Sequence, residues 1–258
     1  KNRRRYSGGG LPFGARDGMI GEENQESLRR WGNLTVKTID RRFREGMTKM
    51  KLLLMAFEPV GSLRLDPSRR VAEQLSEKLL RDGVQAEAVL IPGSFARCGE
   101  EARRQIGRIS PQVVMALAQR GSCEGIAFER RARNLIDAEI PDREGMQPRK
   151  TLIVQGGRAI YETALPIERM AEAVRQKGIP AGISGDAGMF VCNTLYYHLL
   201  RAAETGNFET LFVHLPYLPG QNLRHPQAGL AFEDMVQGLE AAIGVLTQPA
   251  SASRKAEK

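Results

Sequence analysis

The chain has 258 residues, of which 41% are hydrophobic and 26% charged, so it is long enough to bury the core of one α/β domain. Apolar residues are too frequent for a wholly disordered chain, and no apolar run approaches the roughly 18 residues that a membrane helix needs. Three scattered cysteines are too few for a disulfide framework or a CxxC metal site, so we expect reduced thiols and a cytoplasmic location.

The formal net charge of +8 is concentrated at the beginning of the chain. Residues 1–46 hold 11 basic and 6 acidic residues, which leaves three excess positive charges for all the others. Because such a basic segment is usually a solvated tail, we expect no nucleic-acid partner. A protein that binds nucleic acid through this segment is the alternative hypothesis for the charge. We interpret residues 1–46 as a basic, poorly ordered extension, residues 47–247 as one α/β domain and residues 248–258 as a polar tail.

Strand-like apolar runs alternate with amphipathic helical segments from residue 51 onward. In chain order, we expect a strand at 52–57, a helix at 67–80, a strand at 84–91, a helix at 95–109, a strand at 113–117, an extended segment at 126–134, a helix at 166–177, a strand at 181–184, a helix at 190–203, a strand at 211–215 and a helix at 232–246. Alternating β and α units predict a single three-layer α/β/α domain, with a mostly parallel twisted sheet flanked by helices.

Two residues in this pattern suggest nucleophilic chemistry. Cys192 follows a glycine-containing stretch at the start of a predicted helix, where the helix dipole and unpaired N–H groups would lower the pKa of its thiol. His214 ends an apolar strand, where ligands gather in open α/β sheets, and is the candidate base. A core cysteine and a structural histidine are the alternative interpretation. Cys98, expected on a helix face, and Cys123 lack a histidine partner in any readable pattern.

Short motifs in a fixed order extend over about two thirds of the chain. They are Ala56-Phe57-Glu58-Pro59-Val60-Gly61, Asp66-Pro67-Ser68, Gln119, Phe128-Glu129-Arg130, Asn134, Asp137, Ile140-Pro141-Asp142, Gly145, Gln147-Pro148, Phe190-Val191-Cys192-Asn193 and Val213-His214-Leu215-Pro216-Tyr217-Leu218-Pro219. Together they make residues 51–221 resemble the pyroglutamyl peptidase I (pyrrolidone-carboxylate peptidase) family of cysteine peptidases, which remove N-terminal pyroglutamate.

The resemblance implies a catalytic set of Glu129, Cys192 and His214. In the mechanism that it implies, Cys192 attacks the acyl carbon, an acyl-enzyme forms and water hydrolyses it, while His214 moves the proton and Glu129 orients the imidazole. Peptides with an N-terminal pyroglutamate would be the substrates, with no metal or organic cofactor. Members of the family often form homo-oligomers, but no surface pattern in this sequence fixes an assembly.

The pyroglutamyl ring is neutral, flat and compact, so its recognition requires apolar walls and a few backbone hydrogen bonds. By the resemblance, Phe57 and Phe190 stand at wall positions, and Gln119 lies in the loop that contacts the lactam. Val60 occupies a position where the family usually has a second phenylalanine, so one wall of the predicted pocket is smaller. We expect this smaller wall to weaken substrate binding by about 1–3 kcal/mol.

Two further departures concern the charge of the site. The loop at 119–123 differs from the glycine-rich family pattern, and Glu139 stands where the family commonly has an arginine linked to the oxyanion. A carboxylate cannot stabilise an oxyanion, so backbone N–H groups at Cys192, or a base such as Arg133 or Arg143, would have to replace the arginine. The alternative function is therefore a weakly active or inactive homologue that binds pyroglutamyl or otherwise modified N-termini.

Overall fold

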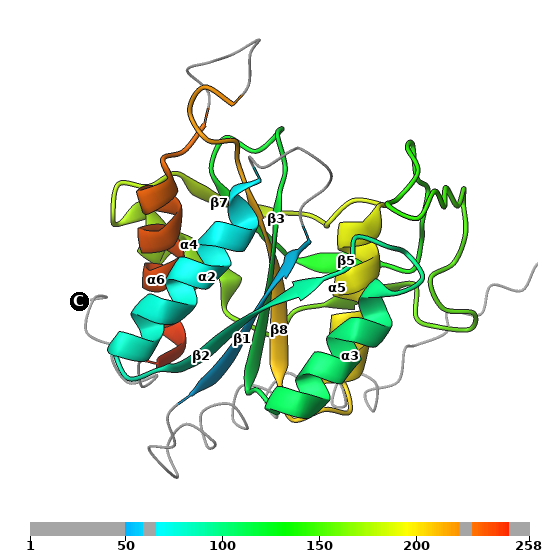
Figure 1. Ribbon diagram of the computed structural model, residues 1–258, viewed down its shortest axis with the longest axis horizontal. Helices are drawn as coiled ribbons and strands as arrows, with labels where there is room; N and C mark the ends of the chain where they lie inside the picture. Colours follow the sequence, from blue (N-terminus) through cyan, green and yellow to red (C-terminus); the bar gives the residue numbers. More distant parts are fainter. Residues whose placement is uncertain (1–49, 59–65, 222–228, 248–258) are drawn as a thin grey trace, which may run out of the picture. The chain divides into compact units, whose positions relative to one another are not determined.

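The computed structural model describes residues 50–58, 66–221 and 229–247 (Figure 1). Its strands are β1 (Lys51–Phe57), β2 (Gln85–Ile91), β3 (Val113–Gln119), β4 (Ile126–Glu129), β5 (Arg131–Arg133), β6 (Ile160–Glu162), β7 (Ala181–Ser184) and β8 (Glu209–Leu215). Its helices are α2 (Pro67–Arg81), α3 (Cys98–Ile109), α4 (Ile167–Arg175), α5 (Val191–Ala203) and α6 (Phe232–Thr247). The extension at 1–46 and the tail from residue 248 lie outside the described residues, so their interpretation stays a prediction.

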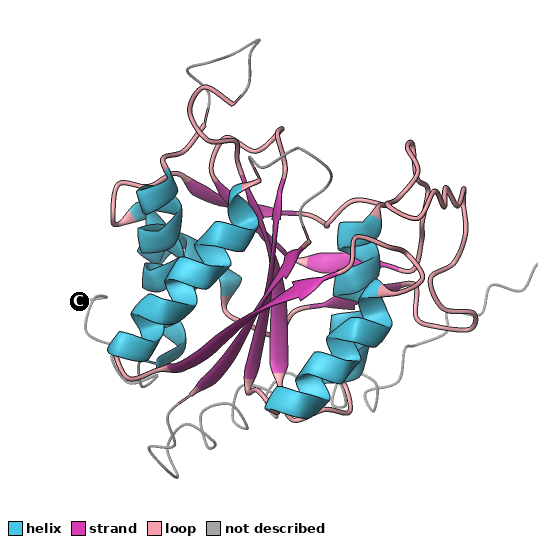
Figure 2. Cartoon of the chain, in the orientation of Figure 1, coloured by secondary structure: helices cyan, strands magenta, loops and turns pink. Residues whose placement is uncertain are grey.

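The main sheet has six strands in the order β2-β1-β3-β8-β4-β7, which confirms the predicted mostly parallel sheet (Figure 2). Strands β2, β1, β3 and β8 are parallel, whereas β4 pairs antiparallel with β8 and parallel with β7. Only six residues separate β3 from β4, and a parallel connection needs a crossover of about a dozen or more. The reversed direction of β4 therefore follows from its short connection.

Helices cover both faces of this sheet, as predicted. In Figure 1, α2, α4 and α6 lie on one face and α3 and α5 on the other. The strands between them are buried on both sides: Leu52 and Leu54 pack under the first group of helices, and Leu53 and Met55 under the second. This burial explains why the central strands read as continuous apolar runs.

The limits of the helices mostly follow the residues that predicted them. The carboxylate of Asp66 accepts a hydrogen bond of 2.8 Å from the Ser68 N–H at the start of α2, and Gly83 takes the left-handed φ of +84° just beyond its end. Helix α3 begins three residues later than expected. The N–H of Phe95 instead donates to a carboxylate oxygen of Asp142 at 2.8 Å, which ties this turn to a distant loop.

The extended segment expected at 126–134 forms two strands instead of one. Strand β4 belongs to the main sheet, and β5 pairs antiparallel with β6 in a separate two-stranded sheet. The sequence does not predict β6, because three residues are too few to display a period. Within the described part of the chain, no helix is long and apolar enough to cross a bilayer.

Candidate active site

The register between β4 and β8 brings Glu129 to His214. Ala127 lies opposite His214 and Glu129 opposite Phe212, so Glu129 and His214 are diagonal neighbours on one face of the sheet. Oε1 of Glu129 lies 2.6 Å from Nδ1 of His214, and both side chains are buried, with 0% and 3% exposed. Because the carboxylate accepts the Nδ1–H, Nε2 is left as the acceptor of the ring.

Cys192 is the second residue of α5, on the face of the sheet that carries His214. It is half-buried and packs against the same apolar cluster as Phe212. Asn193 holds this end of the helix: its side chain accepts from the Arg133 N–H and donates to the carbonyls of Arg133 and Leu135, at 2.8–2.9 Å. The first turn of α5 is thereby fixed to the chain that follows Glu129.

The expectation of a lowered thiol pKa is wrong. Burial raises the pKa of Cys192 to about 12, and this desolvation outweighs the nearby charge of Arg120, which lowers it. Burial also lowers the pKa of His214, against the opposing effect of its hydrogen bond to Glu129. At neutral pH the Cys192 thiol and the His214 imidazole therefore both rest uncharged. In the described part of the chain, no hydrogen bond joins these two side chains.

Two of the predicted substrate-binding residues, Phe57 and Phe190, pack against the same apolar cluster as Cys192. Phe57 ends β1 and Phe190 precedes α5; both are half-buried against the apolar cluster that Cys192 contacts. The ring of Phe190 also meets that of Phe95 edge-on, with 5.2 Å between the centroids. The predicted Val60 wall lies outside the described residues.

Gln119 ends β3, at the edge of the sheet where β8 ends. Its side-chain amide forms two hydrogen bonds with the amide of Gln221, at 2.7 and 2.9 Å. The amide of Gln119 is therefore already used within the protein. Its backbone lies beyond the last residue pair between β1 and β3, and it pairs with Leu215 of β8.

The basic side chains suggested as substitutes for a missing arginine are bound elsewhere. Arg133 pairs with Asp186 at 2.5 Å, and Arg143 pairs with Glu58 at 2.8 Å. Glu139, which occupies the position of the missing arginine, is exposed. Neither suggested substitute is a partner of Glu129 or His214 in the described hydrogen bonds.

A different arginine, which the sequence did not single out, enters the site. Nη1 of Arg120 lies 3.0 Å from Oε1 of Glu129, the same oxygen that bonds His214. The available signal was its position directly after Gln119, at the carboxyl end of a buried strand. Its partner is nine residues away in sequence and across β8 in the sheet, so no local pattern pairs them.

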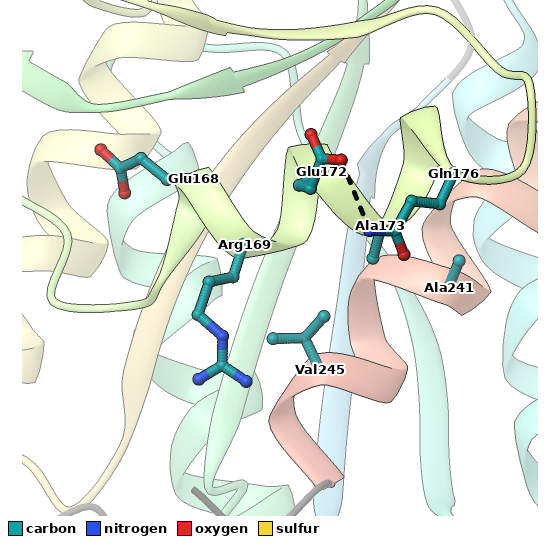
Figure 3. A pocket seen from close by; sticks show the side chains of 7 residues that line it. All are labelled: Glu168, Arg169, Glu172, Ala173, Gln176, Ala241 and Val245. Carbon is teal, nitrogen blue, oxygen red and sulfur yellow. Dashed lines mark hydrogen bonds between the residues drawn. The ribbon is translucent and has the colours of Figure 1, made fainter. Parts of the chain in front are cut away.

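Other places in the described chain offer less chemistry. No group of three or more His, Cys, Asp or Glu side chains among the described residues is arranged to hold a metal ion. A shallow groove of about 420 Å³ runs between α4 and α6 (Figure 3). It is lined by Glu168, Arg169, Glu172, Ala173, Gln176, Ala241 and Val245, on the face of the sheet opposite α5. It contains no thiol or imidazole, so the nucleophile lies elsewhere.

Comparison with known proteins identifies the family. The family described as "Pyroglutamyl peptidase" matches residues 50–249. The chain belongs to this pyroglutamyl peptidase family. It is 38% identical over 201 residues to the pyrrolidone-carboxylate peptidase of Yersinia pestis (strain Pestoides F), covering 77% of this chain and 93% of that protein.

Solved structures of family members have the same fold. The crystal structure of pyroglutamyl peptidase I from Bacillus amyloliquefaciens gives a TM-score of 0.73 at 33% identity, covering 78% of this chain and 97% of that one. The pyrrolidone carboxyl peptidase of Fervidobacterium islandicum gives 0.71 at 30% identity, covering 77% and 98%. These relatives confirm the predicted family and α/β fold, and the chain is a cysteine exopeptidase of the pyroglutamyl peptidase I type.

Proposed function

We propose that the chain hydrolyses the N-terminal pyroglutamyl residue of peptides, with Cys192 as nucleophile, His214 as general base and acid, and Glu129 as the orienting carboxylate. The observation that carries the proposal is the 2.6 Å contact between a fully buried Glu129 and Nδ1 of His214 in a member of this family. A buried carboxylate bonded to one ring nitrogen fixes the other as an acceptor, which is what a thiol nucleophile requires.

The reaction begins from two uncharged groups. As Sγ of Cys192 bonds to the pyroglutamyl acyl carbon, its proton passes to Nε2 of His214, and Glu129 stabilises the imidazolium that forms. The C–N bond to the peptide then breaks, and His214 returns the proton to the leaving amine. A water molecule, deprotonated by His214, attacks the resulting thioester and releases pyroglutamate and the free thiol. Starting from a neutral thiol, proton transfer accompanies attack instead of preceding it.

The start of α5 supplies donors for the oxyanion. The first N–H groups of a helix have no partner within the helix, and no side chain caps those of α5. Cys192 lies among them, so an oxygen on the carbon that it attacks would lie near their positive end. This arrangement supports oxyanion stabilisation without an arginine at position 139.

The half-buried rings of Phe57 and Phe190 support recognition of a neutral lactam, since they offer apolar surface beside the thiol. The backbone of Gln119 is the candidate for hydrogen bonds to the ring, because its side chain is held by Gln221. A charged N-terminal residue would lose its hydration in such a pocket without a matching charge.

Hydrolysis of a pyroglutamyl-coumarin amide tests the proposal. We expect turnover by the wild type, and loss of turnover in both Cys192→Ala and His214→Ala. We also expect 2-pyrrolidone to protect Cys192 from alkylation. Turnover that survives Cys192→Ala contradicts the mechanism. Wild-type protein that is protected by 2-pyrrolidone but releases no coumarin would instead be the binding homologue considered from the sequence.

A further inference from the structure

Arg120 connects the ends of four strands of the main sheet. Its N–H donates to the carbonyl of Leu215 at 2.8 Å, which joins the ends of β3 and β8. Its guanidinium reaches over β8 to Glu129 at 3.0 Å and approaches Ser184, at the end of β7, at 3.5 Å. This side chain thus adds a second link between the reversed strands β4 and β7 and the parallel part of the sheet, besides the backbone pairing of β4 with β8.

The same side chain reaches the loop that leads into α5. Gly188 has a left-handed φ of +86°, and a Cβ built there would lie 3.4 Å from Nη2 of Arg120. Four residues later, Cys192 experiences the charge of Arg120. Arg120 therefore bonds to the carboxylate and acts on the nucleophile through its charge.

Glu129 needs this partner because it is completely buried. Oε1 is shared between His214 and Arg120, and Oε2 has no hydrogen-bond partner among the described residues. His214 compensates the carboxylate charge only while it is protonated. Of the residues described, Arg120 is the one permanently charged cation bonded to Glu129, and a buried carboxylate without a cation is strongly destabilising.

We propose that Arg120 is a positioning residue of the reaction: it holds the Glu129 carboxylate in its orientation, so that Nδ1 of His214 stays bonded and Nε2 stays an acceptor. The proposal rests on the proposed function for its catalytic meaning. The Arg120 side chain is 29% exposed, so its exposure alone does not distinguish it from a surface arginine.

The electrostatics of the site agree with this geometry. The charge of Arg120 lowers the pKa of Cys192 and that of His214. The other groups acting on Cys192 are Asp66, Glu129 and Cys98, all of which raise its pKa. The charge of Arg120 also lowers the pKa of Cys123, in the loop after β3, although burial raises it more. Removal of Arg120 should therefore make both catalytic groups hold their protons to higher pH.

The experiment compares Arg120→Gln and Arg120→Lys with wild type in the full chain. Glutamine can still donate a hydrogen bond but carries no charge, whereas lysine keeps the charge without the planar fork. Arg130→Gln is the matched control, because it removes the same charge from the residue next to Glu129, where Arg130 pairs with the exposed Glu168. The measurements are kcat/KM for a pyroglutamyl-coumarin amide from pH 5 to 9, in steps, and the alkylation rate of each cysteine by peptide mapping.

We expect Arg120→Gln to lower kcat/KM at neutral pH roughly 10- to 100-fold, a part of what general acid–base catalysis contributes. The ascending limb of its pH profile and the alkylation of Cys192 should both move to higher pH. In Arg120→Lys, which keeps the charge, both profiles should lie close to those of wild type. The profiles of Arg130→Gln should coincide with those of wild type. Alkylation of Cys98 serves as an internal reference that none of these variants changes.

A loss of rate in Arg120→Gln with an unmoved pH profile and an unmoved alkylation profile overturns the proposal, since it would mark a merely structural arginine. A shift of equal size in Arg130→Gln also overturns it. If the wild type does not cleave the coumarin amide, the proposed function fails. In that case the alkylation profile still decides whether Arg120 controls the site.

Discussion

Two helices on the same face of the sheet, α3 and α5, each place a cysteine in their first turn. Cys98 is the first residue of α3 and Cys192 the second of α5, and burial raises the pKa of both thiols to about 12. The start of a helix therefore does not by itself produce a reactive thiol in this protein. Desolvation of the sulfur exceeds what the helix dipole supplies.

The difference between the two thiols lies in their neighbours. Cys98 is completely buried, and the charge of Asp142 raises its pKa further. Cys192 is half-buried, and the ends of β3, β4 and β8 bring Arg120, Glu129 and His214 to its side of the sheet. We therefore propose that the reactivity of Cys192 depends on the strand ends that surround the start of α5, and the following predictions test that statement.

The largest expected effect separates the two cysteines directly. Cys192→Ser should lower kcat/KM by at least about 10⁴-fold, because a serine hydroxyl is a far weaker nucleophile beside an unchanged base. Cys98→Ala should retain turnover and lose about 1–2 kcal/mol of unfolding free energy, because it removes a buried sulfur from a packed site. Coumarin release and urea unfolding measure the two quantities on the same samples.

The opposite result would break the comparison. If Cys98→Ala abolished turnover while its unfolding free energy stayed at the wild-type value, the nucleophile would have been assigned to the wrong helix. Cys123→Ser provides a third arm, since this half-buried thiol lies in the loop after β3 and should tolerate the change.

The next effect concerns Glu129, whose charge acts on Cys192 but not on Cys98. Glu129→Gln should lower kcat about 10³- to 10⁴-fold, because the amide can present its NH₂ group to Nδ1 and favour the wrong tautomer of His214. Glu129 raises the pKa of both Cys192 and His214, so its removal should move the alkylation profile of Cys192 to lower pH. This direction is opposite to that expected for Arg120→Gln. Profiles that move in the same direction for the two variants would contradict the charge assignment.

The fold was predictable where a long period or a stop signal existed. Strands such as β1 and β8 are buried on both faces, and their apolar runs are distinct in the sequence. The direction of β4 was not predicted, although the six-residue connection before it carried that information. The three residues of β6 pair with β5 only through tertiary contacts, which no local pattern records.

The site was predictable in part. Cys192 and His214 stand at a helix start and a strand end, where a search for a nucleophile and a base begins. Glu129 was reached only through the family resemblance, because a glutamate beside an arginine ordinarily forms a surface ion pair. In the structure the two neighbouring residues point to opposite sides, as successive residues of an extended chain do. Arg130 forms an ion pair with the exposed Glu168, whereas Glu129 is buried.

A smaller effect tests how the two helix starts are held. Asn193→Ala leaves the N–H of Arg133 and two carbonyls without a partner, which should cost about 1–3 kcal/mol of unfolding free energy. Asn193→Asp keeps the acceptor but buries a carboxylate against the two carbonyl oxygens, so it should cost more unfolding free energy than Asn193→Ala in urea. Because Cys192 moves with this turn, kcat/KM should fall in the same order as stability.

Asp142 offers the matched comparison at α3. Its carboxylate accepts from the N–H groups of Phe95, Glu144 and Met146, so Asp142→Ala should also destabilise the protein. At equal loss of unfolding free energy, we expect it to reduce kcat/KM less than Asn193→Ala does. A larger loss of activity in Asp142→Ala would assign the start of α3 to the site.

The smallest expected effect on stability lies at the contact between α3 and α5, where His198 of α5 packs against Gly99 of α3. A Cβ at Gly99 would lie 2.5 Å from the His198 ring. Burial, followed by the charges of Arg103 and Arg201, lowers the pKa of His198 from its ordinary 6.5 to about 4. Between these values the unfolded chain binds more protons than the folded one, so stability is lost as the pH falls from 6.5 towards 4. His198→Gln, which does not titrate, should unfold at a urea midpoint that falls less than that of wild type between pH 7 and pH 4.5. His214 also has a lowered pKa and is unchanged in the variant, so some pH dependence of the midpoint should persist. If the midpoints of wild type and His198→Gln fell in parallel with pH, His198 would not contribute to the pH dependence of stability.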